Sequence, residues 1–233
     1  MHLLLCFDSY EEALDIVTWE EIEIVDSEKL KAFKSSNFLK TCKFEDMYVD
    51  VLIIQKNTFD AQFRVMTCIQ QRNYHLVIHF NYCIAVDDTL ETGTILNIIN
   101  EKPGYFSLEN GNFNNVYDNQ WMNNSEFPHH RGGFINMTNA YFNVFVDLEK
   151  VVGATLFFEN KNDGFDIKSV MESIGAKVYT TNGLGFAYPC LALKQPFYHI
   201  SVVKKNHNTN TENRSLAVKQ LKLVFDFIIE KIK

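Results

Sequence analysis

Few residues in this chain have the type and spacing of a familiar reactive motif. The first glycine is Gly93, so the chain reaches its fourth predicted strand without the glycine-rich turn that holds phosphate groups in many α/β folds. The adjacent His129 and His130, followed by Arg131, are residue types that bind metal ions or phosphate. Adjacent side chains in a strand point to opposite faces, however, which makes shared ligation of one ion awkward. We therefore expect no metal site at these histidines.

The five cysteines do not have the pattern of a zinc site or of a disulfide framework. They are odd in number, widely spaced and mostly placed inside apolar runs, which favours buried thiols. No pair has the spacing of zinc ligands. We expect Cys6, Cys42, Cys68, Cys83 and Cys190 to be buried, and we expect no metal or other cofactor.

Composition and charge predict one compact domain. Apolar residues make up 46% of the 233 residues, which is enough to bury a large core. The net charge of −7 argues against a nucleic acid or an anionic membrane as partner, because both need a basic surface. The N-terminal apolar run reaches Asp8 after only a few residues, too few for a signal peptide or a membrane span, so we expect a cytoplasmic protein.

The order of apolar runs and helical periodicity predicts alternating strands and helices. Residues 48–55 form a continuous apolar run, typical of a strand buried on both faces. Thr58 is placed to cap the helix that follows. The stretch 102–133 has little periodicity, which predicts a long functional loop. The predicted strands span 2–7, 21–25, 48–55, 75–80, 94–100, 141–147, 151–158, 177–179 and 198–203, and the predicted helices span 10–18, 166–174 and 183–193 and begin near 58 and 213.

Several segments match one enzyme superfamily in the same order along the chain. They begin with MHLLLCFDSYEEALDI and YVDVLIIQKNT, continue with YHLVIHFNYCIAVDDTLETGTILNIINE and NNSEFPHHRGGFIN, and end with GAKVYTTNGLGFAYPCLALKQPFYHISVV and ENRSLAVKQL. On these segments the chain resembles the purine nucleoside phosphorylase and nucleosidase superfamily, and within it most closely futalosine hydrolase of menaquinone biosynthesis. The resemblance implies a three-layer α/β/α sandwich around a central mixed sheet, formed as one domain by residues 1–233.

The resemblance implies that water cleaves an N-glycosidic bond. Such a reaction needs a carboxylate to activate water, an acid to protonate the leaving base and an acceptor for the ribose hydroxyls. Glu12 matches the glutamate of the family that helps to activate water. The helix dipole alone also favours an acid in the first turn of a helix, so a purely structural role for Glu12 stays open.

Two glycine-rich parts of the family pocket fall on large residues in this chain. The Gly-x-Gly turn falls on Gln55 and Asn57, and a floor of alanine and glycine falls on FNYCI, residues 80–84. Phe80, Tyr82 and Ile84 then either fill the substrate cavity or turn into the core. We nevertheless predict that Asn57 and Tyr82 bind the substrate.

The remaining family motifs also lose charged groups in this chain. The glutamate that holds the ribose diol becomes Asn182, preceded by Thr181. The amide of Asn182 can bind a hydroxyl, but it lacks the charge that makes such a hydrogen bond about twice as strong; Asn-Gly is also a turn or helix-start signal in its own right. The general acid falls on Lys204 or Lys205, with Asn206 as a shifted candidate, and a solvated strand end is the alternative for all three.

Three functional hypotheses remain. The first is a catalytically degenerate homologue that acts by binding or assembly, as a homodimer or as the partner of an active relative. The second is a divergent N-ribosyl hydrolase that uses Glu12, with Asn182 at the ribose and Lys205 or Asn206 at the base. The third is a nucleoside or small-molecule sensor in which Tyr82, Phe157 or Phe158 stacks on a base, although aromatic residues in apolar strands more often pack in the core.

Overall fold

The structure is a computed structural model. It describes residues 1–17, 23–25, 38–44, 47–104, 107–109, 112–114, 123, 125–130, 132–136, 147–156 and 166–232. The predicted strand 141–147 lies outside these residues except for its last member. Phe157 and Phe158 also lie outside them.

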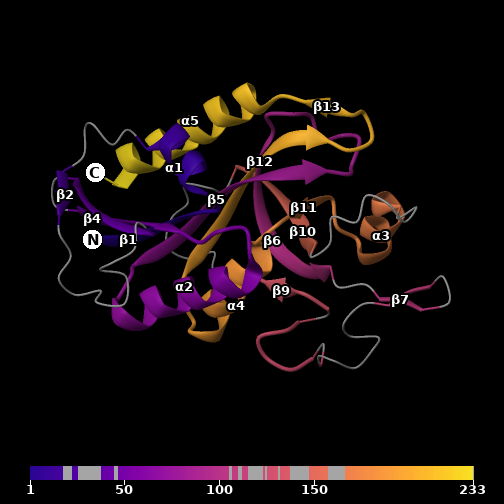
Figure 1. The fold of residues 1–233 in the computed structure, drawn as a ribbon, viewed down its shortest axis with the longest axis horizontal. Helices are drawn as coiled ribbons and strands as arrows, with labels where there is room; N and C mark the ends of the chain where they lie inside the picture. The colour runs from indigo at the N-terminus through magenta and orange to yellow at the C-terminus, as the bar shows by residue number, and fades with distance from the viewer. Residues whose placement is uncertain are drawn as a thin grey trace.

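The described chain forms a mixed sheet between two layers of helices, as expected (Figure 1). The strands are β1 (His2–Phe7), β2 (Glu23–Val25), β3 (Leu39–Phe44), β4 (Met47–Ile53), β5 (Leu76–Ala85), β6 (Ile95–Gly104), β7 (Ser107–Glu109), β8 (Asn112–Asn114), β9 (Phe134–Ile135), β10 (Glu149–Leu156), β11 (Val178–Thr180), β12 (Phe197–Asn206) and β13 (Thr211–Glu212). The helices are α1 (Tyr10–Ile16), α2 (Thr58–Gln71), α3 (Ile167–Ile174), α4 (Gly183–Ala192) and α5 (Arg214–Ile232). Figure 1 shows α1 and α5 on one side of the sheet and α2 and α4 on the other.

Strand pairing combines an open sheet with a closed part. The open part runs from β5 through β1, β4 and β3 to β2, and β1 is parallel to both β4 and β5. In the closed part, β5 pairs with β12, β12 with β6, β6 with β10, β10 with β11, and β11 again with β5. Because parallel strands end at the same edge, β1, β4 and β5 bring the residues that follow them close together.

Strand β1 illustrates why the sheet must be covered on both faces. Its side chains alternate, so that Leu3, Leu5 and Phe7 join the core cluster with α1 and α5. Leu4 and Cys6 join the cluster with α2 and α4 instead. A run in which every residue is apolar therefore suits a central strand buried on both faces.

A buried carboxylate in β4, Asp50, connects several elements of the fold. Asp50 accepts hydrogen bonds from Thr41 Oγ1 at 2.5 Å, Tyr74 OH at 2.6 Å and Arg72 Nη1 at 2.5 Å. Burial acts to raise the pKa of Asp50, but hydrogen bonds from His2, Thr41 and Tyr74 and the charge of Arg72 outweigh burial and lower it. The Asp50 cluster ties together β3, β4, the end of α2 and the start of β5.

Several sequence predictions are confirmed and others are corrected. All five cysteines are buried and free. Thr58 does not cap α2, because Asn57 holds that position and its Oδ1 accepts from Phe59 N at 2.9 Å. The stretch 102–133 is not one irregular loop, since β6 continues to Gly104 and β7 pairs with β8. Strand β3 was not predicted. No described helix is both long and apolar enough to span a membrane.

Candidate functional site

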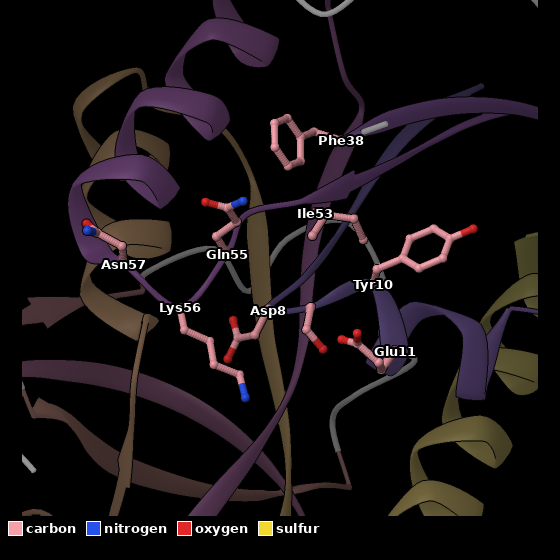
Figure 2. Close-up of a pocket in the computed structure, with 9 residues that line it drawn as sticks. Asp8, Tyr10, Glu11, Phe38, Ile53, Gln55, Lys56 and Asn57 are labelled. Atoms are coloured by element: carbon pink, nitrogen blue, oxygen red, sulfur yellow. The ribbon is translucent and has the colours of Figure 1, made fainter. Parts of the chain in front are cut away.

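A cavity of about 600 Å³ opens at the carboxyl ends of β1 and β4 (Figure 2). It is lined by Asp8 and Ser9 after β1, Tyr10 and Glu11 of α1, Phe38, Ile53, and the segment Gln55, Lys56 and Asn57 before α2. Figure 2 shows Phe38, Ile53 and Tyr10 along one side of the cavity and Asp8 and Lys56 along the other. A pocket with one apolar side and a few polar groups suits a ligand of mixed character, such as an aromatic base joined to a sugar.

Asp8 joins three parts of the fold at this cavity. Its Oδ1 lies 2.7 Å from His79 Nε2 and accepts from Asn182 Nδ2 at 3.3 Å, and its Oδ2 accepts from Thr181 Oγ1 at 3.3 Å. The His79 contact follows from strand pairing, because β1 and β5 are parallel with Cys6 opposite His79. Asp8 was not among the predicted site residues. An acid directly after a buried strand, and a histidine inside the apolar run HLVIHF, are the signals that point to this pair.

Further titratable groups lie buried behind His79. Its ring stacks on His199 with centroids 4.7 Å apart, and His199 Nδ1 lies 3.6 Å from Glu101 Oε2. Burial raises the pKa of Glu101 to about 8, although hydrogen bonds from Thr155 and Thr180 oppose the rise. Burial and the neighbouring His79 lower the pKa of His199. These groups sit on β5, β12 and β6 of the closed part of the sheet.

The segment before α2 keeps a glycine-like backbone at the first position matched to a family glycine. Gln55 has φ of 66°, in the left-handed region that favours glycine. The Gln55 carbonyl accepts a hydrogen bond from Asn182 Nδ2. At the second matched position, Asn57 lines the cavity and caps α2. Among the described residues that line this cavity, Asn57 is therefore the one that was predicted as a site residue.

Glu12 lies beside the cavity but does not line it. Glu12 is 9% exposed. Its backbone N–H donates to the side chain of Ser9, which caps α1. Burial and the nearby Asp8 raise the pKa of Glu12 to about 8, while Lys56 and Lys204 partly offset the rise. Its Oε2 is buried without a hydrogen-bond partner among the described residues.

Two of the three large residues of the predicted floor, Phe80 and Tyr82, pack into the core, and Ile84 is partly buried. Phe80 is fully buried and stacks on Phe7 with centroids 5.6 Å apart. Tyr82 is 8% exposed, and burial and the nearby Glu12 raise its pKa. Tyr82 is thus close to Glu12 on the side of the sheet covered by α1 and α5.

Asn182 and Thr181 meet Asp8 from the other side. Asn182 is fully buried and precedes α4, but its side chain does not cap that helix. Instead Nδ2 donates to Asp8 and to the Gln55 carbonyl. Asn182 is therefore engaged with the protein itself, whereas Thr181 is exposed and donates to Asp8 through Oγ1.

The predicted residues at the end of β12 have separate environments. Lys204 is near enough to Glu12 to lower its pKa. Lys205 pairs with Glu212 in the short ribbon of β12 and β13. Asn206 is buried and donates to the Asp87 carbonyl at 2.9 Å and the Leu90 carbonyl at 3.0 Å, so it holds a turn. The structure therefore gathers Glu12, Thr181 and Asn182 around Asp8, places Tyr82 close to Glu12, and engages Asn206 elsewhere.

These features define a protein with the nucleoside phosphorylase and nucleosidase fold, which confirms the resemblance seen in the sequence at the level of the fold. Among solved structures, native futalosine hydrolase of Helicobacter pylori strain 26695 matches with a TM-score of 0.73 at 12% identity, covering 99% of this chain and 98% of that one. A 5′-methylthioadenosine/S-adenosyl homocysteine nucleosidase of Campylobacter jejuni matches with a TM-score of 0.70 at 14% identity, covering 100% and 98%. The 5′-methylthioadenosine nucleosidase of Arabidopsis thaliana gives 0.67 at 12%, covering 99% and 92%. No family sequence model and no curated protein sequence matches the chain.

Proposed function

We propose that this protein binds a purine-type nucleoside in the cavity beside Asp8 and does not hydrolyse it at an enzymatic rate. It would act through binding or assembly, alone or as the partner of an active relative. The proposal applies to this chain the ligand class named for its structural neighbours, which are a futalosine hydrolase and methylthioadenosine nucleosidases. The mixed apolar and polar lining of the cavity supports such a ligand.

The observation that carries the proposal is the burial of Glu12 beside Asp8, with Oε2 lacking a hydrogen-bond partner among the described residues. With a pKa of about 8, its carboxyl group is ionised in only about one molecule in ten at pH 7. A protonated carboxyl group cannot take a proton from water. The residue matched to the water-activating glutamate is therefore mostly in the wrong state for hydrolysis at neutral pH.

Two neighbouring residues support the same conclusion. Tyr82 lies close to Glu12, at a position where the family has a small residue, and the burial of both side chains leaves little access for an attacking water. Asn182 carries no charge and donates to Asp8 and Gln55. The position matched to the diol-binding glutamate of the family therefore supplies no charge of its own to the ribose.

Isothermal titration calorimetry against adenosine, inosine, 5′-methylthioadenosine and futalosine tests the binding half of the proposal. We expect at least one of them to bind, and a saturating ligand of this kind also raises the unfolding temperature. The variant Gln55→Trp, which places an indole in the cavity, should weaken that binding. The absence of binding across the panel would overturn the proposal.

A divergent N-ribosyl hydrolase is a second candidate, and the closeness of Asp8 and Glu12 favours it. A carboxyl group whose pKa is raised beside a second carboxyl group is a recurring acid–base arrangement. If Glu12 activates the water as a general base, the rate of nucleobase release rises about tenfold per pH unit below the Glu12 pKa of about 8. Glu12→Gln then removes that rise, whereas a pure binding protein shows no release at any pH.

The assembly part of the proposal involves the exposed face of α2. Phe59 and Phe63 are 72% and 67% exposed on successive turns of that helix. We propose that a second copy of this chain covers them, because a neutral aromatic face can pair with itself in a chain whose net charge of −7 repels copies elsewhere. Light scattering after size exclusion should give a dimer, and Phe59→Ser with Phe63→Ser should give a monomer. A monomeric wild type would contradict this part.

A further inference from the structure

We propose that Asp8, held in place by His79, is the group that binds the ribose hydroxyls of the ligand, so the cavity selects a neutral nucleoside with a free 2′,3′-diol. This inference rests on the proposed function and assigns its ligand class more narrowly. In the related family, the ribose hydroxyls are held by a glutamate at the position matched to Asn182. In this chain a carboxylate comes instead from Asp8, directly after β1, and Asn182 donates to it.

The Oδ2 atom of Asp8 can accept a further hydrogen bond. A carboxylate accepts about four hydrogen bonds. Among the described residues, Oδ1 is contacted by His79 and Asn182, while Oδ2 accepts only from Thr181. Asp8 lines the cavity, so a ligand hydroxyl can donate to Oδ2 without displacing the contacts of Oδ1.

His79 keeps the Asp8 carboxylate in one orientation. Its ring is fully buried between Phe186, at 4.8 Å between centroids, and His199, at 4.7 Å. The proton is assigned to Nε2 because that nitrogen faces the carboxylate, while Nδ1 is buried without a hydrogen-bond partner among the described residues. A carboxylate fixed before binding loses little side-chain entropy when the ligand arrives.

The charges around the cavity favour a neutral hydroxyl donor. Lys56 lines the same cavity as Asp8 (Figure 2), so the lining carries charges of both signs and does not select strongly for a charged ligand. Glu11 also lines the cavity, and together with Asp8 it would repel a phosphate. A diol carries no charge and donates two hydrogen bonds, which suits a carboxylate between these groups.

Calorimetry with adenosine, inosine and their 2′,3′-dideoxy analogues tests the inference. Because a hydrogen bond to a charged group is worth roughly a tenfold to hundredfold change in affinity, we expect wild-type protein to prefer the ribonucleoside by about that factor. The variants Asp8→Asn and His79→Phe should lose most of the preference, while His79→Gln, which keeps a donor, should retain more of it. The control Glu172→Gln changes an exposed acid of α3 that does not line the cavity, and it should leave the preference unchanged.

The outcomes separate this inference from the proposed function. If wild-type protein binds ribonucleosides and dideoxynucleosides equally, the role of Asp8 is refuted while nucleoside binding stands. If it binds neither, the proposed function fails and the inference fails with it. Should Asp8→Asn not fold, the ribose preference of the wild type and of His79→Gln still decides the question, because a merely structural histidine would not alter that ratio.

Discussion

Replacing Glu12 by glutamine should stabilise the protein, and the gain should grow with pH. The folded state raises the pKa of Glu12 from 4.5 to about 8, mainly through burial and then through Asp8. A carboxyl group with a raised folded-state pKa makes the protein less stable as the pH rises between those two values, because the unfolded chain releases the proton first. The loss is about 1.4 kcal/mol per pH unit, and it ends once the folded state also ionises near pH 8.

The size of the effect follows from the same values. Since pH 7 lies 2.5 units above 4.5, ionisation in the unfolded chain costs the wild type roughly 3 kcal/mol at that pH. Glutamine has nearly the same shape and does not ionise, so Glu12→Gln removes this cost. The two proteins should be close in stability at pH 5 and should differ by roughly 3 kcal/mol at pH 7.

Urea unfolding at pH 5, 6, 7 and 8 measures the difference directly. Glu11→Gln is the matched control, because Glu11 is the adjacent acid in the same helix. Its pKa is lowered, chiefly by a backbone hydrogen bond and by Ser9, so its replacement should give no gain that grows with pH. If the unfolding free energies of wild type and Glu12→Gln run parallel from pH 5 to pH 8, the assignment of a protonated Glu12 is wrong.

Two further substitutions test the framework around the site. Asp50→Asn should cost about 3 kcal/mol in urea unfolding at pH 7, because it removes the buried charge that accepts hydrogen bonds from Arg72, Thr41 and Tyr74. Since the pKa of Asp50 is lowered, the stability it provides is present above the unfolded-state pKa and is lost as the pH falls through the folded-state value; the exposed Asp60→Asn should change little. Gly183→Ala should cost about 1–3 kcal/mol, because a methyl group there overlaps the Glu101 carboxylate. Adding Glu101→Asp should recover part of that cost, and strictly additive effects would contradict the overlap.

The order of the main elements could be predicted because the central strands β1, β4, β5 and β12 contain long, mainly apolar runs. Strand β1 has its predicted bounds, 2–7, and α3 begins directly after its cap Asp166. Strand β3 was missed because LKTCKF places lysines among its apolar residues and reads as a polar segment. Its burial comes from pairing with β4, which is a tertiary contact.

The centre of the candidate site could not be predicted from one sequence. Asp8 and His79 are 71 residues apart, and they meet only because β1 and β5 pair in parallel with one particular register. Glu12, Thr181 and Asn182 were found through the family resemblance, because matching a family motif by position assumes the strand pairing of that family. Asn206 was included for the same reason, but its side chain supports a turn.

The most direct test of the proposed function is a measurement of base release with protein in excess over nucleoside. Futalosine, 5′-methylthioadenosine, adenosine and inosine are incubated separately with wild-type protein at pH 7 and pH 9, and free base is quantified by chromatography against Glu12→Gln. We predict that each bound nucleoside is recovered intact at both pH values, with no more free base than the variant gives. Release that is faster at pH 9 and absent in Glu12→Gln would contradict the proposal and establish a hydrolase.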